Sequence, residues 1–312
     1  MLSRRNVRIK VMQMLYSLGR DKSLKFDEAM LRYRDKVTKS FELYLFNLLY
    51  LIRVAEYAIL DAESRRSKLR PSEEDKKFNA KLATNPLIVS LSKNEGLYRL
   101  FKLYKTETYL DEDHIRSFYN EFSKKDEYIQ YVYNDTNSDK DHEEMLLALY
   151  RHLCASELYL ELNDDKFSQW EDDESLIIGS IKKTLKALPA EMSFFEAYKP
   201  NAEATVDFGE LLLRKVHHED EALLKVIEPT LRNWDVERVA VIDMILLKMA
   251  LVELMTFKSI PSKVTLNEFV EIAKNYSTDK SKDFINGILD RLMKQLGEEG
   301  KISKEGRGLI SD

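Results

Sequence analysis

The chain has 312 residues, with only 9 glycines, 6 prolines and a single cysteine. Sheet-rich and α/β folds need many tight turns, which draw on glycine, proline and asparagine, so this composition disfavours a nucleotide-binding α/β enzyme. Charged residues make up 33% of the chain and hydrophobic residues 44%, a mixture typical of amphipathic helices with solvated faces. We therefore expect an all-α protein.

The cysteine content and the N-terminal sequence indicate the cellular compartment of such a protein. A single Cys154 excludes an internal disulfide framework and a cysteine-based zinc site, and it suits a reducing compartment. No apolar segment near the N-terminus resembles a signal peptide, because three arginines interrupt the opening. We expect a cytoplasmic protein.

The most apolar stretch, residues 239–255, is the first candidate for a membrane-spanning helix. It carries three charged residues that fall on different sides of a helix: Asp243, Lys248 and Glu253. Such charges would be costly at the centre of a bilayer. We interpret the stretch as a buried helix and expect no membrane association.

The net charge is only −5, but charge is unevenly distributed. Residues 1–40 hold eleven Lys/Arg and four Asp/Glu, a net charge of +7. Residues 141–175 hold two Lys/Arg and eleven Asp/Glu, a net charge of −9. A basic end attracts polyanions and an acidic middle repels them. Both windows could equally be solvated helix faces.

The first predicted helix carries a more specific pattern. At 100° per residue, one narrow apolar stripe is formed by Val7, Val11, Met14, Leu15 and Leu18. Along one flank, away from that stripe, lie Arg4, Arg8, Met12, Arg5 and Tyr16. Arginine binds phosphate bidentately and a tyrosine ring stacks on unpaired bases, so the flank favours single-stranded RNA. In the alternative interpretation, Tyr16 packs under a neighbouring helix and the arginines pair with acids there.

The middle of the chain is also predicted to be helical. Residues 26–67 keep helical spacing over one or two long helices, and residues 71–86 are polar and typical of a linker. Four similar segments then begin at acidic residues placed like helix caps, separated by 28, 32 and 34 residues: Asp113, Asp141, Asp173 and Asp207. We interpret them as similar helices packed side by side, without the signature of a repeat array.

Three further helices are predicted near the C-terminus. The first spans residues 236–255 and is apolar nearly all round, so we expect it to be central. Thr265 and Glu268 have the spacing of a capping box, which predicts a helix from there to Tyr276.

Residues 277–279 would cap the last helix, ending at Leu296 with Gly297 as its C′ residue. Gly287 inside that helix suggests a close approach of another backbone. Residues 300–308 resemble a mobile tail.

Motifs for catalysis and cofactor binding are absent from the sequence: GxGxxG, GxxxxGK[ST], GxSxG and HExxH are all missing. The adjacent pair His217 and His218 point about 100° apart on a helix, so they do not chelate a metal by themselves. The acidic run at residues 164–174 lacks the ligand spacing and glycine of an EF-hand. We expect no catalytic residues, no cofactor and no metal site.

Five segments, in order and correctly spaced, resemble one family. They are RRNVRIKVMQMLY at residues 4–16, FGELL at 208–212, DMILLKMALVEL at 243–254, IPSKVTLNEFVEIAK at 260–274 and FINGILD at 284–290. They are similar to the arginine-rich helix and the conserved blocks of the transcription antitermination factor NusB. The resemblance covers residues 1–40 and 205–297, under half of the chain.

The resemblance implies a non-enzymatic, all-helical protein. Family members bind the single-stranded boxA element of ribosomal-RNA leaders together with ribosomal protein S10, and they assist the RNA polymerase antitermination complex. Carried over by position, the RNA-binding helix would contribute Arg4, Arg5, Arg8, Lys10 and Tyr16. A second RNA-contacting segment would contribute Lys280, Lys282 and Phe284, and Asp243 would lie on the face that meets S10.

This chain departs from the family pattern at several positions. Asn6 stands where the family often has arginine, Lys280 where it has aspartate, and Lys282-Asp283 where it has His-Lys. Lys248 and Val252 replace an arginine and a tyrosine. These changes put the individual RNA contacts of the second segment in doubt.

The resemblance also predicts a domain organisation. Residues 1–69 and 205–297 would form a NusB-like helical bundle, residues 70–204 an acidic helical insertion, and residues 298–312 a flexible tail. Two other functions remain open. One is a helical interaction scaffold with weakened RNA binding, and the other is an accessory part of an RNA-modifying enzyme, although the cofactor loop and catalytic cysteines of such enzymes are missing.

Overall fold

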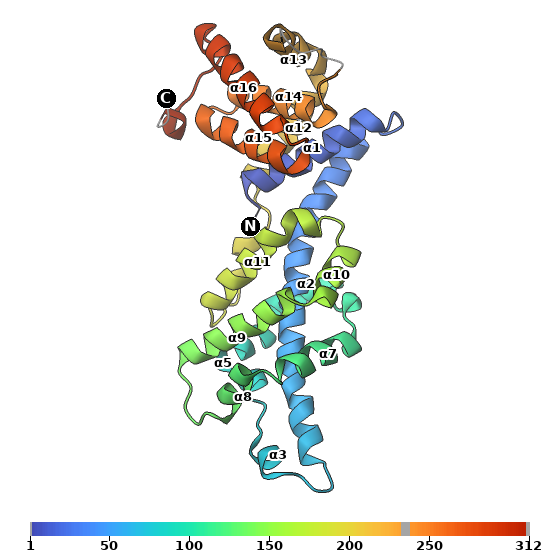
Figure 1. Cartoon of the computed structure of the whole chain (residues 1–312), viewed down its shortest axis with the longest axis vertical. Coiled ribbons are helices and arrows are strands. Elements are labelled where there is room, and N and C mark those ends of the chain that lie inside the picture. Colours follow the sequence, from blue (N-terminus) through green and yellow to red (C-terminus); the bar gives the residue numbers. More distant parts are fainter. Residues whose placement is uncertain (1, 232–237, 310–312) are drawn as a thin grey trace. The chain divides into compact units, whose positions relative to one another are not determined.

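The computed structural model describes residues 2–231 and 238–309 and is helical, with no strand in these ranges, which confirms the all-α fold (Figure 1). The chain forms two compact units. Unit 1 consists of residues 38–199, and unit 2 consists of residues 2–37 and 200 onward.

Helix α2, Phe26–Arg66, is the element that both units share. Its 41 residues begin in unit 2 and continue without a break into unit 1, so the sequence pattern at residues 26–67 belongs to a single helix. By length and composition α2 could cross a membrane, but 72% of its most apolar window is buried in the structure. Burial of this extent is typical of the core helix of a soluble protein.

Unit 1 is built around residues 38–66 of α2, and the helix is buried on all sides from Leu43 to Ile52. The helices that cover it are α3 (Glu73–Lys77), α4 (Lys81–Thr84), α5 (Pro86–Ser92), α6 (Glu95–Leu103), η1 (Thr106–Tyr109), α7 (Glu112–Phe122), α8 (Asp126–Tyr133), α9 (Asp139–Cys154), α10 (Glu157–Lys166), α11 (Trp170–Lys186) and η2 (Phe194–Tyr198). Because α2 has no solvated face over this stretch, it depends on these helices for its burial.

A polar cluster at the centre of unit 1 is satisfied internally. Asn47 donates to Asn163 at 2.7 Å and accepts hydrogen bonds from Tyr150 and Tyr159 at 3.1 and 2.8 Å. Buried polar groups of this kind are tolerated when they are hydrogen-bonded, and they fix which helices meet.

The prediction of a linker at residues 71–86 is wrong. This segment contains α3 and α4, and Phe78 and Leu82 are buried in the core of unit 1. Apolar residues are few in this segment, so its sequence is polar overall. Phe78 and Leu82 nevertheless both reach the core.

The four Asp-led segments take different forms. Asp113, Asp141 and Asp173 lie in the first turns of α7, α9 and α11, as expected. Asp207 lies within η3 (Glu203–Glu210), an eight-residue π-helix.

Unit 2 contains residues 26–37 of α2 together with α1 (Arg4–Arg20), η3, α12 (Leu211–His218), α13 (Asp220–Ile227), η4 (Glu228–Leu231), α14 (Val241–Thr256), α15 (Ser262–Tyr276), α16 (Ser281–Glu298) and η6 (Gly306–Leu309). Helix α14 is central, since Leu246–Leu254 are all buried. It starts at Val241 and not at residue 236 as expected, and the first two residues of the expected helix, 236 and 237, lie outside the described residues.

Several predictions of helix ends near the C-terminus are wrong. Thr265 does not cap α15, which begins at Ser262 with Pro261 as its N-cap residue. Gly297 lies inside α16, and the glycine with positive φ beyond the helix end is Gly300 (φ 65°). Part of the expected tail is packed, because buried Lys304 donates to Phe257 O at 3.2 Å.

The close glycine contact of unit 2 is at Gly209, whereas Gly287 has nothing within 4 Å of the position a Cβ would take. A Cβ on Gly209 would lie 1.9 Å from the Tyr33 hydroxyl oxygen and 2.6 Å from Val7. This glycine lets η3 pack directly against α1 and α2, and Tyr33 donates to Thr205 O at 2.8 Å.

The units do not coincide with the ranges expected from the sequence. The whole of residues 38–69 belongs with residues 70–199 and not with the first helix. The boundary falls within α2, where no change of composition or turn residue marks it.

Candidate nucleic-acid interface

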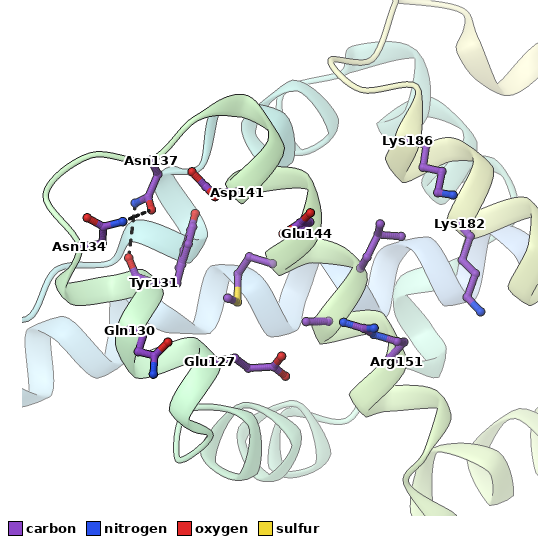
Figure 2. A pocket seen from close by; sticks show the side chains of 13 residues that line it. Glu127, Gln130, Tyr131, Asn134, Asn137, Asp141, Glu144, Arg151, Lys182 and Lys186 are labelled. Atoms are coloured by element: carbon purple, nitrogen blue, oxygen red, sulfur yellow. Dashed lines mark hydrogen bonds between the residues drawn. The ribbon is translucent and has the colours of Figure 1, made fainter.

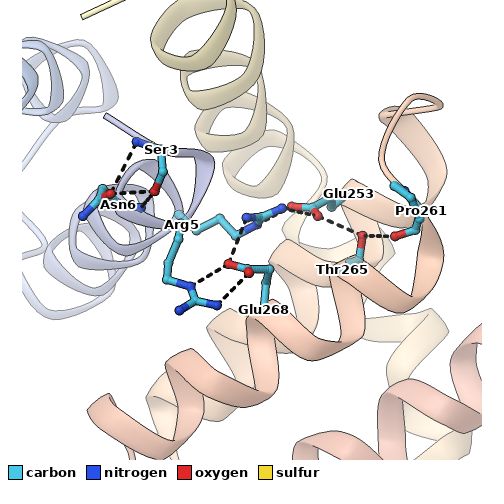
Figure 3. A network of polar contacts seen from close by, with 8 residues as sticks. Ser3, Arg5, Asn6, Glu253, Pro261, Thr265 and Glu268 are labelled. Atoms are coloured by element: carbon cyan, nitrogen blue, oxygen red, sulfur yellow. Dashed lines mark hydrogen bonds and ion pairs between the residues drawn. The ribbon is translucent and has the colours of Figure 1, made fainter. Parts of the chain in front are cut away.

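Helix α1 begins with a capping box formed by Ser3 and Asn6 (Figure 3). The next residues, Arg4 and Arg5, are the accessible arginines of this helix start, with side chains 38% and 52% exposed. Tyr16 is also exposed, and the guanidinium of Arg20 lies 5.4 Å from the centre of its ring. The exposed basic and aromatic groups of α1 therefore lie near its start and near its end.

Arg8 is buried, with 2% of its side chain exposed, so the expected exposed flank of three arginines is wrong at this position. Its Nε and one Nη donate to the two carboxylate oxygens of Glu253 on α14, at 2.7 and 2.6 Å. The guanidinium also lies 5.2 Å from the ring centre of Phe208 on η3. The acid-pairing alternative considered for these arginines applies to Arg8.

Lys10 and Met12 are buried as well, which corrects the expectation that Lys10 contacts RNA. Lys10 is 1% exposed, and its polar group is engaged within the protein. Helix α1 is covered on more sides than its apolar stripe indicates, because η3, α12 and α14 all pack against it.

A chain of charges connects this helix start to the interior. Glu268 accepts hydrogen bonds from Arg5 Nε and Nη2 at 2.8 and 2.7 Å, and Arg8 Nη1 lies 3.4 Å from the same carboxylate (Figure 3). Behind Arg8, the fully buried Glu253 also accepts from Thr265 Oγ1 at 2.8 Å. Although burial raises the pKa of Glu268, the hydrogen bond from Arg5 and the charges of Arg8 and Arg5 lower it overall.

A hollow lies beside this chain of charges. Its polar lining includes Ser3, Arg5 and Glu268, and its apolar lining is formed by Ile260, Pro261 and Val264. Val264 is 42% exposed, so apolar surface is accessible next to the Arg5 guanidinium. A flat group with polar edges fits this combination.

The second expected segment lies at the start of α16. Lys280 and Lys282 are exposed, whereas Phe284 is half-buried. The structure therefore leaves the two lysines accessible and gives Phe284 at least a partial packing role.

Asp243 is buried and does not offer an exposed surface to a partner, which corrects the expectation for this residue. Its Oδ2 accepts a hydrogen bond from Ser281 Oγ at 2.7 Å, so it fixes the first residue of α16. Its Oδ1 has no hydrogen-bond partner among the described residues.

Three residues around the arginines were missed by sequence reasoning. Glu203 pairs with Arg4 at 2.8 Å, Glu253 pairs with Arg8, and Phe208 lies beneath both arginines. All three are far from α1 in sequence, and the pair of Arg4 and Glu203 alone is separated by 199 positions. The helical periodicity of α1 therefore cannot predict these three partners. The acids on the predicted C-terminal helices were the available hint, because buried charges need partners.

Unit 1 has an open pocket of mixed charge (Figure 2). Arg151, Lys182 and Lys186 lie on one side, and Glu127 and Glu144 lie across from them. Among the described residues, no ion pair joins the acidic and basic side chains across this pocket.

The other candidate groups for chemistry are structural. Burial raises the pKa of the Cys154 thiol to about 11, the opposite of what a nucleophile needs. His217 stacks on Phe26 with ring centres 4.6 Å apart. Among the described residues, no group of three or more His, Cys, Asp or Glu is placed to hold a metal ion.

The chain matches the model of the NusB family over residues 167–294, a range that includes most of unit 2 and begins within unit 1. The transcription antitermination protein NusB of Salinibacter ruber is 43% identical over 107 residues, which are 34% of this chain and 67% of the relative. That of Chloroherpeton thalassium is 46% identical over 78 residues, or 25% and 37%. That of Geobacter sulfurreducens is 35% identical over 115 residues, or 37% and 83%. No solved structure matches the chain significantly.

Proposed function

Because the chain belongs to the NusB family, we propose that it is an RNA-binding transcription antitermination factor. In this proposal unit 2 binds boxA-like single-stranded RNA of ribosomal-RNA leaders. Ribosomal protein S10 binds beside it, and the complex acts on RNA polymerase. The relatives are named for antitermination, and their similarity covers about a third of this chain.

The observation that carries the proposal is the pair of accessible guanidiniums at the start of α1. Arg4 and Arg5 are both accessible beside a hollow with apolar lining. Tyr16 with Arg20 offers a stacking surface near the other end of the same helix. Guanidiniums that donate to phosphates or base edges, combined with rings or apolar surface on which bases stack, are the usual composition of a single-strand site.

Lys280 and Lys282 extend the proposed interface as phosphate contacts. Both are exposed at the start of α16, whose first residue is held by Asp243. Point charges on flexible side chains attract phosphate without fixing its orientation, so these lysines add affinity more than specificity.

RNA titration tests the proposal. Purified protein, with and without S10, is titrated with boxA RNA and a scrambled strand at several salt concentrations. We expect a preference for boxA in the presence of S10, and a log–log salt slope of roughly 0.7 for each phosphate contact on a single strand. Equal affinity for both strands in the presence of S10 would contradict the proposal.

Tyr16 gives a second test at the level of one side chain. Tyr16→Ala should cost about 1–3 kcal/mol of binding free energy if a base stacks on its ring. The matched control is Tyr133→Ala, an exposed tyrosine of unit 1, which should leave RNA affinity unchanged. Both affinities are measured by the same titration, and an equal loss in the two variants would remove Tyr16 from the interface.

A role as a helical interaction scaffold is the second candidate, and unit 1 is the feature that favours it. Residues 38–199 contain 23 Lys/Arg and 30 Asp/Glu, a net charge of −7, which disfavours RNA. The pocket of mixed charge in Figure 2 lies in this unit. Salt-sensitive RNA binding that survives charge reversal at Arg151, Lys182 and Lys186 would place RNA recognition outside unit 1.

A further inference from the structure

The hollow beside Arg5 combines an apolar surface with a guanidinium that is already oriented. Val264 and Pro261, at the start of α15, supply accessible apolar surface, and Ser3 lies at the opposite rim with the start of α1. Stacking on an apolar surface is sequence-tolerant, so the polar group at the edge of the hollow would decide which base it accepts.

The Arg5 guanidinium has one edge occupied by Glu268, and no hydrogen bond to its other edge is found among the described residues. Arginine has five N–H donors, and Glu268 accepts hydrogen bonds from two of its nitrogens, Nε and Nη2. The remaining donors include the fork at the end of the side chain. Because Glu268 is itself held by Arg8, which is fixed by the buried Glu253, the direction of this fork is set before any ligand arrives.

The ion pair with Glu268 also changes which ligands Arg5 attracts. An isolated guanidinium attracts phosphate at long range, but Arg5 and Glu268 together are neutral. Its hydrogen-bond donors remain available at short range. A paired arginine is therefore better suited to a neutral base edge than to the phosphate backbone.

We propose that this hollow binds a guanine base of single-stranded RNA, with the base lying on Val264 and Pro261 and its O6 and N7 accepting hydrogen bonds from Arg5. Guanine presents two acceptors on this edge, which match the arginine fork. Adenine presents a donor at N6 in place of O6, and pyrimidines lack N7. The site rests on the proposed RNA-binding function and names the base that unit 2 selects.

In this arrangement Glu268 is a positioning residue that determines specificity without touching RNA. Glu268→Gln removes the negative charge that neutralises Arg5 and weakens the hydrogen bonds that orient it. The freed guanidinium then binds phosphate of any sequence. This variant should bind more strongly to RNA without guanine and gain about 0.7 in salt slope, the value of one phosphate contact on a single strand.

The experiment uses the full chain and short uridine strands that carry isolated guanosines, adenosines or 7-deazaguanosines. We expect the wild-type protein to favour the guanosine strand over the adenosine strand about tenfold, within the range for one bidentate arginine–guanine contact. The 7-deazaguanosine strand, which lacks the N7 acceptor, should lose most of that preference. Arg5→Lys keeps the charge but lacks the fork, so it should retain the salt slope and the affinity for the adenosine strand while losing the preference for guanosine.

The matched control is Glu28→Gln. Glu28 forms an exposed ion pair with Arg32 on α2, so the charge change is the same as in Glu268→Gln but lies away from the hollow. It should leave both the preference and the salt slope unchanged.

The outcomes separate the two proposals. A wild-type protein that binds neither these strands nor boxA RNA in the presence of S10 contradicts the RNA-binding function itself. Binding to boxA RNA without binding to any of these strands overturns the guanine site. Salt-sensitive binding with equal affinity for all three strands overturns the guanine site and leaves the function standing. If Glu268→Gln does not fold, Arg5→Lys decides, because retention of the guanosine preference in that variant overturns the assignment of Arg5.

Discussion

Arg8 shows how a single buried charge links three helices of unit 2. Its guanidinium on α1 is paired with Glu253 on α14 and lies near Glu268 on α15. Burying two charges is costly, and the cost is recovered only while both partners are present. The residue therefore matters to folding before it matters to any ligand.

Replacing Arg8 by Met should lower the free energy of unfolding by about 3–5 kcal/mol, because Glu253 would stay buried without its cation. Chemical denaturation followed by circular dichroism measures the loss. The double variant Arg8→Met/Glu253→Leu removes both charges and should recover much of it. A double variant no more stable than the single one would contradict this account.

Among the described glycines of unit 2, Gly209 has the closest contacts with an added methyl group. Gly209→Ala places a Cβ against Tyr33 and Val7 and should cost about 1–3 kcal/mol of stability. Gly287→Ala on α16 is the matched control, because its Cβ meets nothing within 4 Å and alanine is the better helix former by about 1 kcal/mol. Thermal unfolding of the two variants should shift in opposite directions.

The acidic residues paired with arginines make unit 2 sensitive to acid. The hydrogen bond and charge of Arg34 lower the pKa of Glu210, and the pKa of Glu268 is also lowered. Since both folded-state pKa values lie below those of the unfolded chain, their contribution is present above about pH 4.5 and is lost as the pH falls through the lower folded values.

Thermal unfolding temperatures should therefore fall steeply below about pH 4.5, and Glu210→Gln and Glu268→Gln should each reduce the steepness. The comparison is between each variant and the wild-type protein over the same pH series. An unchanged pH profile in both variants would mean that these ion pairs do not contribute to stability.

At the scale of elements, Asp243 connects the central helix α14 to the start of α16. Asp243→Ala should cost about 1–3 kcal/mol, because Ser281 loses its buried acceptor. Lys282→Ala, one residue from Ser281 and exposed, should leave stability unchanged. A stable Asp243→Ala variant that fails only to bind S10 would instead support the partner-binding role that the family resemblance implies.

Helical periodicity predicted α1 and α2 well, since both depend on spacing within one segment. The environments of their side chains were harder to predict. The helical wheel placed Arg8 beside Arg4, but the width of the buried face is set by η3 and α14, which are remote in sequence.

Thr265 failed as a capping residue for a similar reason. Its hydroxyl donates to Glu253 on another helix, a non-local partner that competes with the local capping pattern. The exposure of Arg4, Arg5 and Tyr16 was thus predictable from the sequence, whereas the hollow, which depends on α15 lying beside α1, was not.

At the scale of the whole molecule, the division within α2 makes a prediction about truncation. Removal of residues 70–204 alone would expose the apolar residues of the second half of α2, from Phe41 to Ala62, which unit 1 buries. We expect that variant to aggregate.

Replacement of residues 38–199 by a short Gly/Ser linker should instead give a folded unit 2. Within that unit the two ends are already close, because Arg34 pairs with Glu210 and Tyr33 donates to Thr205 O. Gel filtration, circular dichroism and RNA titration compare the two variants. If both aggregate, unit 2 does not fold independently of unit 1.

The π-helical η3 has a consequence for the phase of its side chains. In an α-helix, residues seven positions apart lie on nearly the same face. A π-helix has about 4.4 residues per turn, so the same seven positions place side chains close to half a turn apart. Glu203 and Glu210 are separated by seven positions, yet they pair with Arg4 of α1 and Arg34 of α2. The wider turn thus lets one short segment contact two helices at once, because its two carboxylates point in different directions.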